Sequence, residues 1–133
     1  MPIAYLDVPT GADLDTKKEL VKGIYDALRE VYPFPDDTRI FLSEWPLDSV
    51  SQNGLLGSEP ARPVFTVHIP DEAVDIAAKR KMLNRIHMAV ANAYRLPDFM
   101  VFLQEYPLGR VAHDGGILAD DQQRVEDQKK AYS

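Results

Sequence analysis

The pattern of apolar and polar residues predicts two strand–helix–strand units in succession. Short runs rich in Ile, Val, Leu, Tyr and Phe at residues 3–8 and 64–69 predict the opening strands. Dense apolar segments at 39–45 and 99–106 predict the closing strands. Between them, apolar residues recur at helical spacing and define one buried stripe per helix. These stripes are Leu20, Ile24, Ala27, Leu28 and Val31, then Leu83, Ile86, Val90 and Ala93.

Capping residues mark where each helix begins and ends. Asp13 or Asp15 is expected to cap the first helix and Asp75 the second, because a carboxylate accepts hydrogen bonds from the free N–H groups of the first turn. Proline cannot continue a helix. The prolines expected to close the two helices are Pro33, Pro35 and Pro97.

The second unit repeats the first. The segment FLSEWPL at 41–47 recurs as FLQEYPL at 102–108, an offset of 61 positions, and the same offset relates Pro2 to Pro63. Helix residues match at an offset of 62. Matches at separate places in the same order indicate an internal duplication.

The duplication divides a single domain of residues 1–133 into four parts. We place repeat one at about 2–47, a linker at 48–62, repeat two at about 63–108, and a C-terminal loop and tail at 109–133. Residues 109–117 hold three glycines and predict a hairpin or loop, and the charged tail predicts a solvated helix or arm.

The two units together predict an α+β fold. A helix that connects two strands usually leaves them as parallel neighbours, so two β-α-β units side by side give a four-stranded sheet with both helices on one face. The other face then needs a cover. This predicts an oligomer whose sheets pack around a central axis as a barrel.

Composition excludes several classes of function. The 133 residues include no cysteine, which excludes disulfides, thiolate catalysis and zinc–thiolate clusters. With 15 basic and 21 acidic residues, the net charge of −6 argues against nucleic acid or an anionic membrane as partner. Three histidines without paired spacing argue against a metal site. The chain has neither a membrane-spanning run nor a basic leader, so we expect a cytoplasmic protein.

Pro2 is the main candidate for chemistry. Removal of Met1 would free its backbone nitrogen as a secondary amine at the start of a strand. Desolvation and nearby cations lower the pKa of such an amine toward neutrality, where it serves as a general base. On the residues alone, an alternative is open: proline at a strand start needs no ladder donor and can be purely structural.

These features together resemble the tautomerase superfamily. Pro2-Ile3-Ala4, Gly11, Asp13, Pro35 and the segment 39–44 follow the order seen in 4-oxalocrotonate tautomerase. The duplication is similar to the longer members, in which two units are fused in one chain and three chains form the assembly. The resemblance covers residues 2 to about 117 and implies a homotrimer.

The resemblance implies an isomerase without a cofactor. It would be a keto–enol tautomerase that acts on a small 2-oxo or 2-hydroxy-unsaturated carboxylic acid, with Pro2 as general base. Arg39 matches the family arginine before the second strand, and a guanidinium there can hold a carboxylate. On the residues alone, the favoured interpretation of Arg39 is a solvated charge at a strand end. Pro63 lies inside the chain as a tertiary amide, so one base per chain is expected.

The chain departs from the family pattern at several positions. Ala12 stands where the family has a second substrate arginine, Val50 near its hairpin aromatic, and Met100 where repeat one has its arginine. The dehalogenase and decarboxylase branches fit less well, with Leu28 at their helix histidine and the acidic segment 70–73 at their arginine pair. The alternatives are a non-catalytic trimeric binding module, or a hydratase, dehalogenase or decarboxylase acting on a small unsaturated or 3-oxo acid.

Five further residues are considered for the site. Arg110 is a candidate replacement for the missing arginine, or a solvated loop charge. His113 can titrate near neutrality, although such loop histidines are commonly surface residues. Trp45 and Tyr106 end equivalent strands and either line a pocket or pack in a core or between subunits. His68, on a strand, is expected to face the helix-free side and receives no role.

Overall fold

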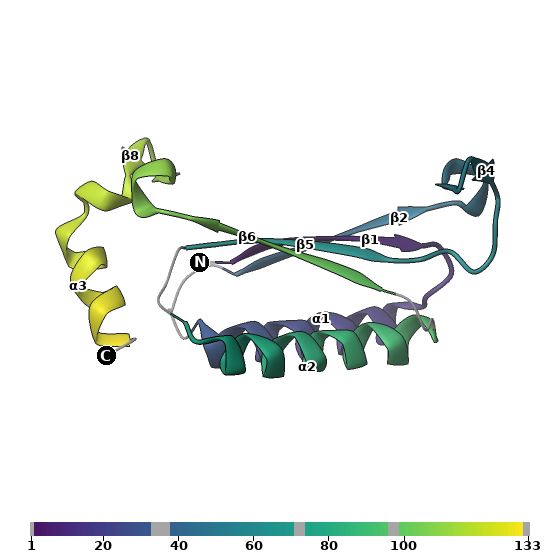
Figure 1. The fold of residues 1–133 in the computed structure, drawn as a ribbon, viewed down its shortest axis with the longest axis horizontal. Coiled ribbons are helices and arrows are strands. Elements are labelled where there is room, and N and C mark those ends of the chain that lie inside the picture. The colour runs from purple at the N-terminus through teal and green to yellow at the C-terminus, as the bar shows by residue number, and fades with distance from the viewer. Residues whose placement is uncertain (1, 33–37, 71–73, 96–98, 132–133) are drawn as a thin grey trace.

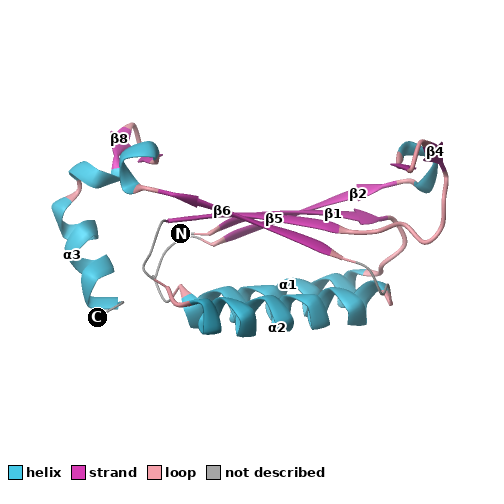
Figure 2. Ribbon diagram, in the orientation of Figure 1, coloured by secondary structure: helices cyan, strands magenta, loops and turns pink. Residues whose placement is uncertain are grey.

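The computed structural model describes residues 2–32, 38–70, 74–95 and 99–131 (Figure 1). Two helices lie side by side against one face of a four-stranded sheet, and the other face is bare (Figure 2). The principal elements are β1 (Ile3–Pro9), α1 (Leu14–Val31), β2 (Arg39–Trp45), β5 (Val64–Pro70), α2 (Ile76–Tyr94) and β6 (Met100–Tyr106).

The strand order is β2-β1-β5-β6. Within each repeat the two strands are parallel, and β1 and β5 join the repeats in antiparallel pairing at the centre. This arrangement confirms the predicted α+β class, the parallel pairing within each unit and the placement of both helices on one face. The barrel-like oligomer stays a prediction.

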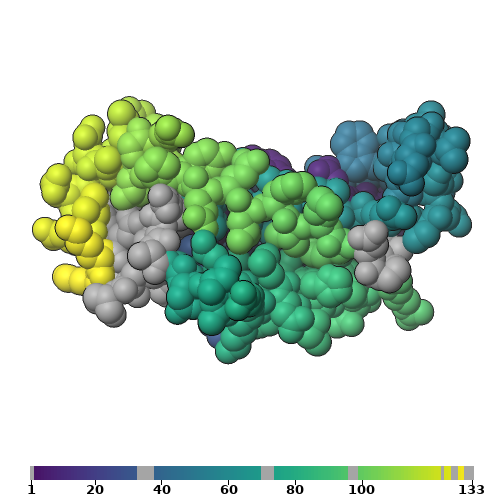
Figure 3. Space-filling model, viewed as in Figure 1, coloured from purple at the N-terminus to yellow at the C-terminus, as the bar shows by residue number. Residues whose placement is uncertain are grey.

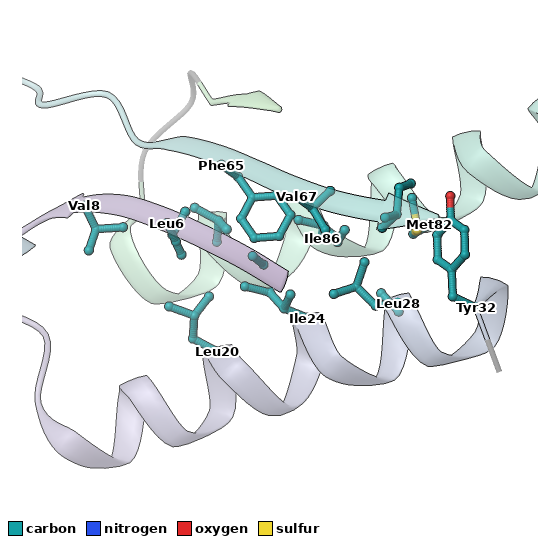
Figure 4. Packing of buried hydrophobic residues seen from close by; sticks show 14 residues of the cluster. Leu6, Val8, Leu20, Ile24, Leu28, Tyr32, Phe65, Val67, Met82 and Ile86 are labelled. Atoms are coloured by element: carbon teal, nitrogen blue, oxygen red, sulfur yellow. The ribbon is translucent and has the colours of Figure 1, made fainter. Parts of the chain in front are cut away.

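The core lies between the sheet and the helices (Figure 4). Alternate residues of each central strand point to the helices because side chains along a strand alternate between faces. The strand residues buried in this way are Ala4, Leu6, Val8, Phe65, Val67 and Ile69. The helix stripe of α1 is buried as predicted from Leu20 to Leu28, whereas α2 fully buries Met82 and leaves Leu83 at the core margin.

The helix starts follow the predicted caps. Asp13 Oδ1 accepts the Thr16 N–H at 2.8 Å, and Asp75 Oδ1 accepts the Ala78 N–H at 2.7 Å. The Thr16 hydrogen bonds lower the pKa of Asp13 because they favour its charged form. The prolines expected to end the helices lie outside the described residues.

Ion pairs join the two helices to each other and each helix to its sheet. Glu30 of α1 binds Lys81 of α2 at 2.9 Å and also Arg85, and these cations, Lys81 first, lower the pKa of the Glu30 carboxyl. Lys17 Nζ lies 2.7 Å from Glu44 Oε1. The corresponding pair in the second repeat is Lys79 with Glu105. The duplication is therefore visible in the side-chain contacts as well as in the fold.

A short hairpin follows each closing strand and stands above the bare face (Figures 1 and 3). Each begins with a 3₁₀ turn and bends at a dipeptide in the left-handed region, Asn53-Gly54 or Asp114-Gly115. These dipeptides suit two-residue hairpin turns because both positions need positive φ. The first hairpin has η1 (Leu47–Ser49), β3 (Ser51–Gln52) and β4 (Leu55–Leu56), and the second has η2 (Leu108–Arg110), β7 (Ala112–His113) and β8 (Gly116–Ile117).

The last described elements are η3 (Leu118–Asp120) and α3 (Gln122–Ala131), the helix predicted for the tail. On the bare face, Tyr5, Phe41, Met100 and Phe102 are 43% to 57% exposed. Exposed aromatic and aliphatic side chains on one face favour a covering partner. None of the helices in the described ranges is long and apolar enough to cross a membrane.

Candidate active site

Pro2 lies at the edge of the core, immediately before β1. Its side chain is fully buried, and its carbonyl oxygen accepts the Arg39 N–H at 3.1 Å. Arg39 begins β2 beside it, with an exposed side chain on the helix-free face. The first residue of β2 is thus held next to the residue that opens β1.

The second repeat copies this backbone arrangement at the opposite end of the sheet. Pro63 is buried, and its carbonyl accepts the Met100 N–H at 3.4 Å. The strand pairs are therefore equivalent. The side chains at the two ends differ, because Met100 stands where repeat one has Arg39.

Four residues form a row across the helix-free face at the Pro2 end. Ile3 pairs with Arg39 on one side and with His68 on the other, and His68 pairs with Gln104 of β6. Paired residues share a face of the sheet. Arg39 and His68 therefore flank the residue that follows Pro2.

A polar network surrounds His68 on this face, as predicted for its orientation. Its Nδ1 lies 2.8 Å from the Tyr106 hydroxyl, which donates to Gln104 Oε1 at 2.9 Å. The imidazole also stacks on the Tyr106 ring, with centroids 5.5 Å apart, and meets the Tyr5 ring edge-on at 5.7 Å. These contacts hold the half-buried imidazole in one orientation.

Arg110 and His113 follow β6 in the second hairpin, at the same end of the sheet as Pro2 (Figure 1). Both side chains are exposed. His113 Nδ1 lies 3.5 Å from Asp114 Oδ2, and the histidine borders a cavity of about 240 Å³ that Asp120 and Asp121 also line. Tyr106, by contrast, is hydrogen-bonded to His68 through its hydroxyl group.

Trp45 lies at the other end of the sheet from Pro2, because it ends the strand that Arg39 begins. Its indole Nε1–H donates to Asp7 Oδ1 at 2.8 Å. Both residues border a cavity of about 360 Å³ near Pro63, together with Arg62 and several apolar residues. Within one chain, Trp45 therefore lines a cavity that is remote from Pro2.

Sequence reasoning missed two equivalent hydrogen-bonded positions, Asp7 and His68, of which His68 lies at the Pro2 end. They are equivalent at the offset of 61, and their partners Trp45 and Tyr106 are equivalent as well. Each pair forms a hydrogen bond across its strands. The available signal was that an acid, Asp7, in the first opening strand corresponds to an imidazole, His68, in the second.

Tyr94, at the end of α2, carries a buried hydroxyl without a hydrogen-bond partner within the described ranges. Burial, and secondarily the charge of Glu44, raises the pKa of this hydroxyl.

No cluster of three or more His, Asp or Glu side chains among the described residues has the geometry to hold a metal ion.

No family model and no curated protein sequence matches the chain. Solved structures do match its fold. A wild-type F6 fused 4-OT, an asymmetric trimer, has a TM-score of 0.78 and 21% identity over 90% of this chain and 98% of its own. Pt0534 inactivated by 2-oxo-3-pentynoate has a TM-score of 0.77 and 18% identity over the same shares.

Malonate semialdehyde decarboxylase is also similar, with a TM-score of 0.65 and 17% identity over 90% of this chain and 98% of its own. At these identities the likeness shows a shared fold. The chain therefore has the duplicated β-α-β fold that the resemblance to fused tautomerases implied. The matched structures include enzymes that differ in their reactions.

Proposed function

We propose that this protein is a keto–enol tautomerase acting on a small 2-oxo or 2-hydroxy-unsaturated carboxylic acid, and that it works as a homotrimer. The observation that carries the proposal is the placement of Pro2 beside Arg39 at one end of a fused tautomerase fold. The matched fused 4-OT structures that are themselves trimers support the assembly.

In the proposed mechanism, removal of Met1 exposes the Pro2 nitrogen as a secondary amine. The surrounding buried apolar residues disfavour the ammonium form and so favour a base that is active near neutral pH. This amine moves a proton between the oxygen and a carbon of the substrate. Arg39 binds the carboxylate and stabilises the charge that develops on the adjacent enolate.

Arg110 is proposed as the second cation of the site. The family arginine is replaced by Ala12, and one donor placed where charge develops contributes about 3 kcal/mol to the barrier. Arg110 lies in the hairpin at the Pro2 end, with an exposed guanidinium. Its location at this end of the sheet supports a role at the Pro2 site of its own chain or of a neighbour.

Dehalogenase, hydratase and decarboxylase chemistry is less well supported. The helix histidine of those branches falls at Leu28, which is completely buried between α1 and the sheet. A side chain at that position contacts the core and not a substrate. Most of the acidic segment that replaces their arginine pair lies outside the described residues.

A covalent probe tests the proposal. 2-Oxo-3-pentynoate carries an activated alkyne, to which an unprotonated amine adds without loss of any atom. Intact-mass spectrometry should first show a chain without Met1, and then a gain equal to the mass of one probe molecule on the peptide that begins with Pro2. Retention of Met1, or an adduct confined to lysine, would exclude the proline mechanism. Either result would favour the alternative of a non-catalytic trimer of the same fold.

A further inference from the structure

The hydrogen bonds around His68 determine which of its ring nitrogens carries hydrogen. Gln104 Oε1 can only accept, so the Tyr106 hydroxyl hydrogen points to it. The Tyr106 oxygen then accepts from His68 Nδ1–H across 2.8 Å. A neutral imidazole with hydrogen on Nδ1 has a lone pair on Nε2, which is free to accept another hydrogen bond.

The position of His68 places this acceptor near the proposed base. His68 and Arg39 flank Ile3 in the same row of the sheet, and Pro2 precedes Ile3. The backbones of His68 and Arg39 are separated by two strand spacings, which is about 10 Å. A small acid bound over Ile3 would therefore have a guanidinium on one side and an imidazole acceptor on the other.

The opposite end of the sheet lacks this combination. There Asp7 stands in place of His68 and Met100 in place of Arg39, while Trp45 replaces Tyr106. Asp7 accepts the Trp45 indole N–H, and a carboxylate at that position would repel a substrate acid. The imidazole thus occurs at the end that also holds Pro2, whose nitrogen is freed by removal of Met1 in the proposed mechanism.

We propose that His68 is a substrate-contacting residue whose Nε2 accepts a hydrogen bond from the 2-hydroxyl group of the enol form, while Arg39 holds the carboxylate. The inference rests on the proposed function and adds a specificity element to it. Tyr106 and Gln104 act as positioning residues, because they orient the ring and keep hydrogen on Nδ1. The site would consequently prefer acids with a hydroxyl at carbon 2.

Two substitutions of His68 separate substrate contact from a structural role. His68→Gln retains a polar atom near the Nε2 position, whereas His68→Asn retains one near Nδ1, beside Tyr106. If Nε2 contacts substrate, Asn should lower kcat/KM for 2-hydroxymuconate by about tenfold or more relative to Gln. A purely structural network predicts the reverse order, which would overturn the proposal.

A pair of ligands that differ in one group gives a second readout. Muconate has the two carboxylates of 2-hydroxymuconate without the hydroxyl. Its inhibition constant should stay within about twofold of wild type in His68→Asn, since the lost hydrogen bond is not made to this ligand. Equal weakening of both ligands would mean that His68 does not recognise the hydroxyl.

The tautomer can be observed directly by nitrogen-15 NMR of the histidine side chains at a pH where His68 is neutral. We expect His68 hydrogen on Nδ1 in the wild type, and a changed tautomer population in Tyr106→Phe, which lacks the accepting oxygen. Hydrogen on Nε2 in the wild type would contradict the inference.

Asp7→Asn is the matched control at the other end of the sheet and should leave kcat/KM unchanged. The two proposals fail in different ways. Loss of activity in Pro2→Ala with full activity in both His68 variants would overturn only the role of His68. Full activity in Pro2→Ala would overturn the proline mechanism itself.

Discussion

The two ends of the sheet share a backbone and differ in their side chains. Each has a buried proline whose carbonyl accepts an N–H from the next strand, and a hydrogen bond between side chains of neighbouring strands. One end has Arg39 and His68, and the other has Met100 and Asp7. The comparison shows that the two repeats share a scaffold, while Arg39 and the imidazole of His68 lie at the end where removal of Met1 would free a proline nitrogen.

The largest expected effect comes from the prolines themselves. Pro2→Ala should lower kcat/KM for 2-hydroxymuconate by about 100-fold or more, the usual contribution of a positioned base. Pro63→Ala should leave the rate unchanged because that nitrogen is an amide. Steady-state kinetics on the two variants makes the comparison, and circular dichroism checks the fold. Equal losses in both would indicate that the prolines matter only for structure.

Arg39→Met makes the Pro2 end resemble its counterpart in repeat two. We expect kcat/KM to fall by about 100-fold, since a donor at developing charge contributes about 3 kcal/mol. The reciprocal variant, Met100→Arg, should gain no activity because Pro63 has no basic nitrogen. Kinetics with both variants and with Arg39→Lys separates the need for charge from the need for a forked donor. An active Arg39→Met would assign the carboxylate to another cation.

The smallest expected effect is a change in stability, and it distinguishes two equivalent tyrosines, Tyr94 and Tyr32. Tyr94→Phe removes a buried hydroxyl that has no partner in the described part of the chain, and should raise the free energy of unfolding by about 1 kcal/mol. Urea denaturation measures this difference. Tyr32→Phe is the control, and it should give no gain because Tyr94 alone is orphaned among the described side chains.

The same tyrosine predicts a dependence on alkaline pH. Burial raises the pKa of Tyr94 in the folded state, so the folded protein holds this proton more tightly than the unfolded chain. The free energy by which the folded state favours the protonated hydroxyl is fully present below the ordinary tyrosine pKa of about 10. It is lost as pH rises through the raised pKa of the folded state. The free energy of unfolding of Tyr94→Phe should therefore exceed that of the wild type by more near pH 11 than at neutral pH, as measured by urea denaturation.

Local pattern was sufficient to predict the elements and their caps. The bounds of the four long strands differ from the predicted ones by at most one residue, and Asp13 and Asp75 cap the helices as expected. Such features depend on side chains within one turn or one strand, so they can be recognised without knowledge of distant contacts. The predicted stripe of α2 contained Leu83 and left out Met82. Both residues are apolar and point about 100° apart around the helix, so only packing against the sheet shows which of them faces the core.

The side-chain arrangement of the candidate site could be predicted less completely from the sequence. Pro2 and Arg39 were identified, and their backbones are in contact. Trp45 was grouped with them, although strand direction places it at the far end of the sheet. His68 received no role because its partners are Tyr106 and Tyr5, which are remote in sequence. Their proximity depends on how β1 and β5 pair across the repeats.

The sequence by itself determined the duplicated strand–helix–strand order, the buried faces and the presence of a proline ahead of the first strand, because these follow from periodicity and residue type. The tertiary structure decided which residues share an end of the sheet. The antiparallel pairing of β1 with β5 sets His68 opposite Ile3 and Asp7 opposite Val64. A shift of one residue in that pairing would turn either side chain to the other face, and local sequence does not specify the register between two distant strands.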